Sequence, residues 1–277
     1  MRQWQSRKML PHLISLVLLS VLAACGGAKE ESRPEVIRPE TPRPEASRGA
    51  VAAPVFGDAD PHDWIGKAPW HYPVHGIDVS RYQGEIDWRR VRGADVSFAY
   101  IKATEGGDVV DEMFETNWAR ARAAGVPRGA YHYYYFCRSP EEQARWFASH
   151  VPADPSALPP VLDIEWTHQS KTCRFRPEPE EAREMMHRFL KALVLRYHKR
   201  PLIYTTVDFY SDNQLWKVTG YNFWLRSVAG HPSLTYPAQD WLLWQYTGTG
   251  IVPGIEGKAD LNAFVGSRAE FANWVSR

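Results

Sequence analysis

The chain has 277 residues, of which 44% are hydrophobic and 12 are tryptophan, so it can bury one sizeable core. Its 33 basic and 32 acidic side chains give a net charge of +1 at pH 7. Because no strong field of one sign surrounds such a chain, its composition argues against a general nucleic-acid binder.

The N-terminus has the pattern of a bacterial export signal that ends in a lipidation site. Arg2, Arg7 and Lys8 precede an apolar stretch, from about residue 13 to 24, that is too short for a permanent membrane helix. The stretch ends in LAACG (22–26), which resembles the lipobox of bacterial lipoproteins. We therefore predict a signal peptide over 1–24 and a lipid on Cys25, with an ordinary secretory signal as the alternative.

The composition of the next segment predicts a tether. From Gly26 to about Asp60 the sequence is rich in Pro, Glu and Arg and has almost no apolar periodicity. Such a composition favours an extended, disordered chain. We assign 25–70 to the lipidated cysteine and this Pro-rich tether, and 71–277 to a single folded domain. Gly26 resembles the residue of lipoproteins sent to the outer membrane, so we expect the domain in the periplasm or at the cell surface.

From residue 75 onward, short β-branched or aromatic runs alternate with helical patterns, as in repeated βα units of an α/β fold. The apolar residues of the predicted helix 179–198 recur every three or four positions, and two further helices are predicted at 112–124 and 140–151. Connections in the second half have little helical pattern, including a Gly-rich loop between 247 and 259. Eight strands predict an irregular TIM-like barrel, with an open doubly wound sheet as the alternative. The predicted strands are 75–80, 96–104, 128–136, 159–166, 200–206, 222–228, 241–247 and 259–264.

Two cysteines lie in the predicted domain, Cys137 and Cys173. In an oxidising compartment such a pair favours a disulfide, and two free buried thiols are the alternative.

Two acids stand at the end of an apolar strand, PPVLDIEW at 159–166. Asp163 and Glu165 are two positions apart, so they project from one face of the strand. This spacing arises by chance roughly four times in a chain of this composition, and their position therefore matters more. The C-terminal strand ends of a parallel barrel form its active-site face, and close like charges raise one pKa. Asp78 and Asp260 lie at the ends of the first and last strands, which a closed barrel makes neighbours.

Aromatic residues accompany these acids. Tyr131, Tyr133 and Tyr135 share one face of the third predicted strand. Any one aromatic is more often a core residue, but aromatic planes beside acids are typical of a sugar-binding cleft. The other aromatic residues on or near strand ends are Trp166, Tyr204, Trp224, Trp244 and Tyr246.

The strand segments that carry these acids and aromatic residues, taken in chain order, resemble glycoside hydrolase family 25, the Chalaropsis-type lysozymes. The resemblance covers nearly all of 74–277 and implies a barrel of five βα units followed by three strands. It also implies N-acetylmuramidase activity on the β-1,4 link between N-acetylmuramic acid and N-acetylglucosamine in peptidoglycan. The matching segments are HGIDVSRYQGEIDW (75–88), FAYIKATEG (98–106), RGAYHYY (128–134), PVLDIE (160–165), PLIYT (201–205), FWLRSV (223–228), LWQYT (243–247) and ADLNAF (259–264).

The resemblance also implies residue roles. Glu165 would be the general acid, with Asp163, Asp78 and Asp260 as the other active-site carboxylates. By similarity to other Asp-x-Glu glycosidases, Asp163 would orient the substrate acetamide, so that the product retains its configuration. Direct attack by a carboxylate and inversion by water are the rival mechanisms. Arg226 stands where many relatives carry a small residue. The implied substrate-binding residues are Lys102, Tyr133, Tyr135, Tyr204, Trp224, Trp244 and Gln245.

Two other functions remain open at this point. A chitinase-like hydrolase also has acids spaced by one residue, but its longer run of acids is replaced here by Leu158 and Val161. A non-catalytic peptidoglycan-binding lipoprotein is expected to lack one of the four acids. We expect a monomer that needs no cofactor and binds no metal, because the histidines that we considered lack ligand spacing. They are His132, His150, His168 and His187.

Overall fold

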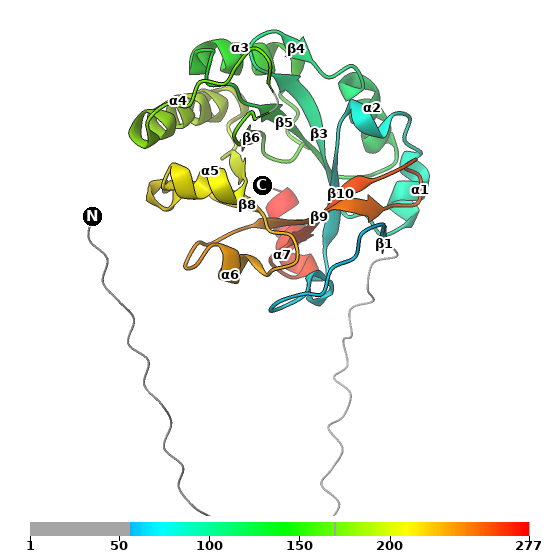
Figure 1. Ribbon diagram of the computed structural model, residues 1–277. Coiled ribbons are helices and arrows are strands. Elements are labelled where there is room, and N and C mark those ends of the chain that lie inside the picture. Colours follow the sequence, from blue (N-terminus) through cyan, green and yellow to red (C-terminus); the bar gives the residue numbers. More distant parts are fainter. Residues whose placement is uncertain (1–55, 169, 277) are drawn as a thin grey trace, which may run out of the picture. The chain divides into compact units, whose positions relative to one another are not determined.

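The computed structural model describes residues 56–168 and 170–276. The predicted signal peptide, the predicted lipidation site at Cys25 and most of the predicted tether lie outside these residues. The described part forms one closed barrel surrounded by helices (Figure 1).

Eight strands make the barrel, and their order around it is β9-β10-β2-β3-β5-β6-β7-β8, with β8 pairing back to β9. Neighbours from β2 through to β9 run parallel, whereas β10 is antiparallel to both β9 and β2. The pairing of β8 with β9 closes the sheet, so the open-sheet alternative is wrong. The strands are β2 (His75–Val79), β3 (Phe98–Glu105), β5 (Arg128–Tyr133), β6 (Val161–Ile164), β7 (Leu202–Thr205), β8 (Asn222–Arg226), β9 (Leu243–Ile251) and β10 (Ala259–Phe264).

A helix follows each of the first five barrel strands. A four-residue helix follows the sixth, no helix lies in the described connection after the seventh, and the C-terminal helix follows the eighth. This confirms the predicted irregular barrel of five βα units followed by three strands. The α-helices are α1 (Trp88–Gly93), α2 (Phe114–Ala123), α3 (Pro140–His150), α4 (Pro179–Tyr197), α5 (Val207–Asp212), α6 (Pro232–Thr235) and α7 (Arg268–Val275). Short 3-10 helices lie at Pro69–His71, Arg81–Gln83 and Leu215–Lys217, and two-residue strands are β1 (Gly57–Asp58) and β4 (Val109–Val110).

The helix ends follow local sequence signals. Ser139 accepts a hydrogen bond from the Glu142 amide and Pro140 occupies the first turn of α3. Ser267 and Glu270 form a capping box that begins α7. These side chains satisfy amide groups that have no partner inside the helix, so they fix where each helix starts.

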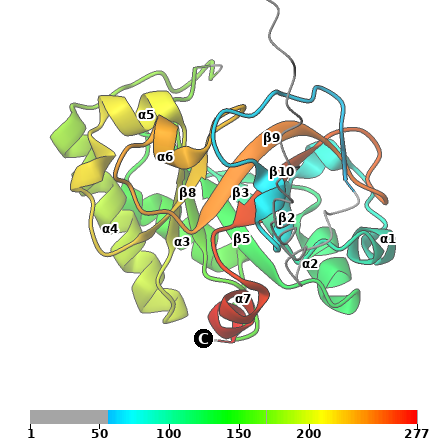
Figure 2. The ribbon, with the colours of Figure 1, turned by 90° about the horizontal axis from the view of Figure 1, so that it is seen from below.

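The core has two layers, one on each side of the barrel wall. Phe189, Leu190 and Leu193 of α4 are fully buried in the outer layer, between strands and helices. Inside the barrel, residues such as Phe98 and Leu202, at the starts of their strands, form a second cluster, to which α7 adds Phe271. Figure 2 shows α7 at one end of the barrel. The N-terminal strand ends are therefore filled with apolar side chains, and a site can open only at the C-terminal ends.

The folded part starts earlier than predicted. β1 pairs antiparallel with β9, with Gly57 opposite Ile251. Trp64 packs edge-on against Trp244, with ring centroids 5.5 Å apart. The predicted domain boundary at 70/71 is therefore wrong, and the folded unit begins no later than Phe56. A few apolar residues without periodicity dock this segment, so the sequence pattern did not reveal it.

Other differences concern element lengths. β9 continues to Ile251, where the sequence predicted a Gly-rich loop, because its distal half pairs with β1 and β10. β5 ends at Tyr133 rather than at residue 136. Within the described ranges, none of the helices combines the length and apolar character that spanning a membrane requires.

Candidate active site

A pocket of about 300 Å³ opens at the C-terminal ends of the parallel barrel strands. Every acid that the sequence singled out lines it. The lining residues are Asp78, Ser80, Tyr82, Lys102, Tyr131, Tyr133, Asp163, Glu165, Tyr204, Trp224, Arg226, Gln245 and Asp260.

The strand ends bring the four carboxylates together. Asp163 belongs to β6 and Glu165 follows its last residue, Ile164. Asp78 lies near the end of β2, and Asp260 lies near the start of β10, directly opposite Asp78 in the antiparallel pair. The expected adjacency of the first and last strands is thus confirmed, and the four acids share one low-dielectric pocket.

Asp78 is held by two side-chain amides. Its Oδ2 accepts hydrogen bonds from Gln245 Nε2 at 3.0 Å and from Asn262 Nδ2 at 2.8 Å. The amide oxygens accept from the Tyr204 hydroxyl and the Trp224 indole N–H, both at 2.8 Å. Since each amide oxygen already faces a donor, each amide must present its N–H to Asp78. The network therefore suits an ionised Asp78.

Asp260 favours the protonated form. Burial, followed by the negative charge of Asp78, raises the pKa of Asp260 to about 8. Burial also raises the pKa of Asp78, to about 6, while the bonds from Asn262 and Gln245 oppose the shift. At neutral pH the two facing carboxyls thus hold one proton, mainly on Asp260.

Asp163 is buried with an unpaired oxygen. Its Oδ1 is inaccessible to water and makes no hydrogen bond to any described residue. Burial, and then the charge of Glu165, raises the pKa of Asp163 well above its usual value. A buried carboxyl oxygen without a partner is costly, so a ligand in the pocket that brings a hydrogen-bond donor to Asp163 would stabilise this carboxyl.

Glu165 has the properties of a proton donor. Burial raises the pKa of its carboxyl above the usual value, while the Tyr133 hydroxyl and the charge of Arg226 work in the opposite direction. A carboxyl with a raised pKa keeps its proton at a pH where an ordinary glutamate has lost it.

Most of the predicted substrate-binding residues reach the pocket. Lys102 lies 2.6 Å from a Glu105 oxygen and 4.9 Å from the Tyr133 ring centroid. Tyr135 does not line the pocket, although its ring is 5.6 Å from that of Tyr133, and its hydroxyl bonds to Glu105.

Trp244 needs a correction. It is fully buried, its indole N–H donates to the Ser227 carbonyl at 2.7 Å, and its ring packs against Trp64 and Tyr72. Its neighbour Gln245 faces the pocket, so Trp244 must face the outer core, because adjacent strand residues point in opposite directions. Its predicted place in the substrate site is therefore wrong.

Three residues around the acids were not predicted from the sequence. Ser80 and Tyr82 line the pocket, and the Tyr82 side chain is 77% exposed. Both follow β2 directly, at the end of the barrel where a site was expected. Asn262, which holds Asp78, lies two positions after Asp260 and therefore on the same face of β10.

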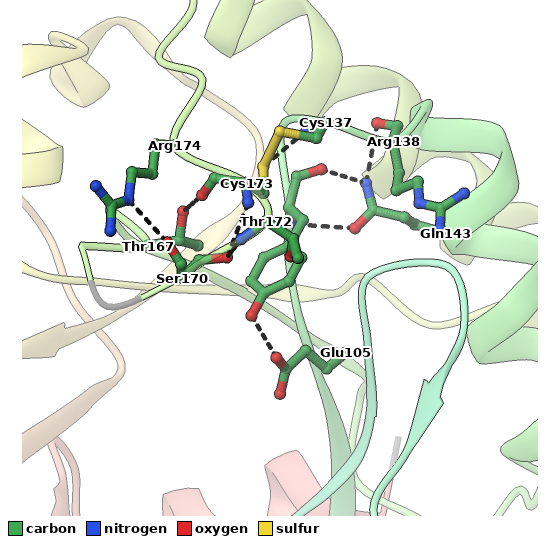
Figure 3. The surroundings of a disulfide bond; sticks show 10 residues. Glu105, Cys137, Arg138, Gln143, Thr167, Ser170, Thr172, Cys173 and Arg174 are labelled. Carbon is green, nitrogen blue, oxygen red and sulfur yellow. Dashed lines mark hydrogen bonds between the residues drawn. A yellow bond between two sulfur atoms is a disulfide. The ribbon is translucent and has the colours of Figure 1, made fainter.

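A disulfide joins the two loops beside this pocket. Cys137, after β5, is bonded to Cys173, in the segment between β6 and α4 (Figure 3). Gln143 of α3 holds the first loop through bonds to the backbone N–H and carbonyl of Tyr135, at 2.9 and 2.8 Å. The disulfide therefore links the segment after Glu165 to a loop that is itself fixed, as the pair of cysteines predicted.

No cluster of three or more His, Cys, Asp or Glu side chains placed to hold a metal ion occurs among residues 56–168 and 170–276. His132 is a buried core residue instead, bonded to Thr104 at 2.7 Å and to Gln143 at 3.1 Å. Burial lowers its pKa to about 4, so it is neutral at physiological pH.

A barrel with carboxylates and aromatic rings at the C-terminal ends of its strands defines a glycoside-hydrolase type of site. The sequence profile of "Glycosyl hydrolases family 25" matches residues 77–255. The chain belongs to glycosyl hydrolase family 25. It is therefore an enzyme of the lysozyme type, which excludes the chitinase-like and non-catalytic alternatives.

Individual proteins agree with this assignment. The chain is 37% identical over 207 residues to Lysozyme M1 of Streptomyces globisporus, covering 71% of this chain and 69% of the lysozyme. It is 37% identical over 217 residues to the uncharacterized protein YegX of Escherichia coli O6:H1, covering 76% of each. A solved structure of a family 25 glycosyl hydrolase from Bacillus anthracis superimposes with a TM-score of 0.70 and 35% identity, covering 79% of this chain and 99% of the other.

Proposed function

We propose that this enzyme hydrolyses the β-1,4 bond between N-acetylmuramic acid and N-acetylglucosamine in peptidoglycan. The main support is that two complementary acids line the same pocket. The raised pKa of Glu165 favours its protonated form, and the buried Oδ1 of Asp163 has no partner among the described residues. The similarity to a lysozyme supports the choice of glycan.

In the proposed mechanism Glu165 gives its proton to the glycosidic oxygen as the bond to the anomeric carbon breaks. The N-acetyl carbonyl oxygen of the same sugar attacks the anomeric carbon, and the acetamide N–H donates a hydrogen bond to Asp163. This donor and the developing positive charge favour the ionised form of Asp163, which stabilises the cyclic cation. Water then opens the cyclic intermediate, with Glu165 taking a proton from that water. Two displacements at one carbon retain the configuration.

Asp78 and Asp260 support this step through charge and position in our proposal. The proton held mainly by Asp260 keeps this carboxyl pair at one negative charge, which limits the repulsion between the pair and Asp163. A direct nucleophile at Asp78 is disfavoured, because one of its oxygens is already engaged by two amides.

The test is the Glu165→Gln variant, expressed from residue 26 onward without the export signal and incubated with purified peptidoglycan. We expect wild-type protein to release reducing N-acetylmuramic acid and the variant to lose at least about a hundredfold in rate. Glu180→Gln, at an exposed position on α4, is the matched control. Undiminished turnover by Glu165→Gln, or reducing N-acetylglucosamine from the wild type, contradicts the proposal.

We also propose that Cys25 is lipidated and anchors the enzyme to the envelope, in the outer membrane. This rests on the LAACG sequence at 22–26 and the Pro-rich composition that follows. Metabolic labelling with a fatty acid should mark the full-length chain and not the Cys25→Ala variant, and membrane fractionation should recover only the former with the outer membrane. A labelled Cys25→Ala protein would refute the anchor.

A further inference from the structure

Arg226 is the last residue of β8, and it lines the pocket. Its backbone is fixed on two sides: the Tyr236 hydroxyl donates to the Arg226 carbonyl at 2.6 Å, and the residue pairs with Gln245 across β8 and β9. Because the backbone is fixed, the side chain starts from a defined place at the rim, close to the amide that holds Asp78.

Two cationic side chains line the pocket, and among the residues that the structure describes only one of them forms an ion pair. Lys102 forms a 2.6 Å ion pair with Glu105. The Arg226 guanidinium makes no ion pair or hydrogen bond with another residue in the described ranges, and the residue is exposed. It still acts on the acids through space, since its charge lowers the pKa values of Asp78, Glu165 and Asp260 against their burial.

The ionised carboxyls of the pocket, Asp78 among them, repel an anionic substrate, and the unpaired guanidinium of Arg226 offsets this repulsion near its own position. Guanidinium groups bind carboxylates through two parallel hydrogen bonds. N-acetylglucosamine offers no carboxylate. N-acetylmuramic acid has a lactyl ether whose carboxylate is free in peptide-stripped glycan, and the attached stem peptide has carboxylates of its own.

We propose that Arg226 is a specificity-determining residue that binds a carboxylate on the N-acetylmuramic acid side of the substrate. This inference rests on the proposed function and deepens it. Arg226 thereby gives the enzyme a preference for acidic glycans over neutral ones of the same length.

A purely electrostatic role is the rival explanation, in which Arg226 only adjusts the acids. The two differ in their dependence on the substrate. Loss of a substrate contact affects only substrates that carry the carboxylate and acts mainly on KM, whereas a change in the acids affects all substrates and moves the pH profile.

The experiment uses three soluble substrates built on the same alternating glycan: one with free lactyl carboxylates, one with those carboxylates converted to methylamides, and one with stem peptides attached. Wild type, Arg226→Gln and Arg226→Lys are compared from residue 26 onward, with the exposed Arg200→Gln as control. For Arg226→Gln we expect kcat/KM to fall about tenfold or more on a carboxylate substrate, mainly through KM. Rates are compared at the pH optimum of each variant, because loss of the Arg226 charge also raises the pKa of Glu165 and moves the pH profile on every substrate alike. At the optimum we expect less than a twofold change on the methylamide and partial rescue by lysine.

The first and third substrates identify the source of the carboxylate. A selective loss on the free lactyl glycan assigns the contact to the lactyl group, and a loss confined to the peptide-bearing glycan assigns it to the stem peptide. An equal loss on all three substrates at the pH optimum, or no loss at all, overturns the inference. If wild-type protein cleaves none of them, or releases reducing N-acetylglucosamine, it is the proposed function that fails.

Discussion

Hydrogen-bond partners distinguish two of the buried acids in the pocket. Asp78 and Asp163 are both buried carboxyls, yet Asp78 has two amide donors and Asp163 has an oxygen with none among the described residues. Donors favour the ionised form and their absence favours the neutral one. The two aspartates therefore differ: Asp78 belongs to a hydrogen-bond network within the protein, whereas Asp163 has an oxygen that a ligand could pair.

The orientation of Gln245 should matter for activity. Tyr204→Phe removes the hydroxyl that holds the Gln245 oxygen, so the amide is free to turn away from Asp78. Tyr210→Phe is a matched control, because it removes a similar 2.9 Å bond to Gln239 at a tyrosine that does not line the pocket. We expect each to cost about 1 kcal/mol of stability and only Tyr204→Phe to reduce kcat by about tenfold. Equal kcat values in the two variants would show that this orientation is unimportant.

The pH dependence of activity follows from Glu165. In the proposed mechanism this carboxyl must be protonated to act. Burial raises its pKa, so kcat/KM should stay high above the usual glutamate range and fall as pH rises through the raised pKa. Tyr133→Phe removes a hydrogen bond that lowers this pKa and should therefore move the fall to higher pH. Initial rates between pH 4 and pH 9 measure this shift. A displacement toward lower pH would contradict the assigned role of the Tyr133 hydroxyl.

Strand alternation explains which residues the sequence could place. Asp163 and Glu165 could be assigned to one pocket because they are two positions apart on a strand. The same rule forbids adjacent Trp244 and Gln245 from sharing that pocket, and the error for Trp244 came from giving residue type more weight than alternation. Hydrogen-bond partners such as Asn262 depend on which strands are neighbours, and this a single strand does not reveal.

At the scale of elements, the disulfide compensates for a long connection. The segment from Glu165 to the start of α4 at Pro179 contains no helix or strand among its described residues. It begins at the proposed proton donor, and the bond to Cys137 ties it to the loop held by Gln143 (Figure 3). The bond thereby limits the conformations open to a chain that adjoins the pocket.

Removal of the disulfide should affect both stability and activity. The cysteines are 36 residues apart, and closing a loop of this size contributes about 3–4 kcal/mol in the chain-entropy account. The free energy of unfolding of the double variant Cys137→Ala/Cys173→Ala should be lower by about this amount. The variant should therefore unfold at a lower denaturant concentration. Its kcat/KM should also fall, because the segment after Glu165 becomes mobile. An unchanged unfolding midpoint would show that the folded segment needs no cross-link.

Long elements with a regular pattern were predictable, and short ones were not. The eight barrel strands and α4 show several apolar residues at strand or helix spacing. β1 and β4 have two residues each, too few to show any period. β9 extends beyond its prediction because pairing with β1 and β10 stabilises a Gly- and Thr-rich sequence that has little strand preference alone.

At the scale of the whole molecule, the pocket lowers stability. Asp78, Asp163 and Asp260 all have higher pKa values in the folded protein than the usual aspartate value. Groups of this kind contribute stability that is fully present below the unfolded pKa and is lost as pH rises through the folded pKa. We therefore expect these acids to lower the free energy of unfolding between about pH 4 and pH 8.

This sign can be tested with two opposite variants. Asp260→Asn removes a carboxyl with a pKa of about 8, so it should stabilise the protein by on the order of 1–3 kcal/mol at pH 8, with little gain near pH 4, while activity falls. Asp154 has a pKa lowered to about 2, where its hydrogen bonds from Ser156 and Arg128 outweigh burial. Asp154→Asn should therefore destabilise the protein at both pH values. Thermal unfolding at pH 4 and pH 8 measures both, and a less stable Asp260→Asn protein at pH 8 would contradict the expectation.

The reversed direction of β10 decides which turns an engineer can vary. Since β10 runs opposite to its neighbours, Asp260 enters the pocket from the start of its strand, and the hairpin at 252–258 lies at the catalytic end of the barrel. The turn after β10 lies at the other end, next to α7. Grafted loops intended to extend the pocket therefore belong between β9 and β10, whereas a fusion partner at the C-terminus stays away from it.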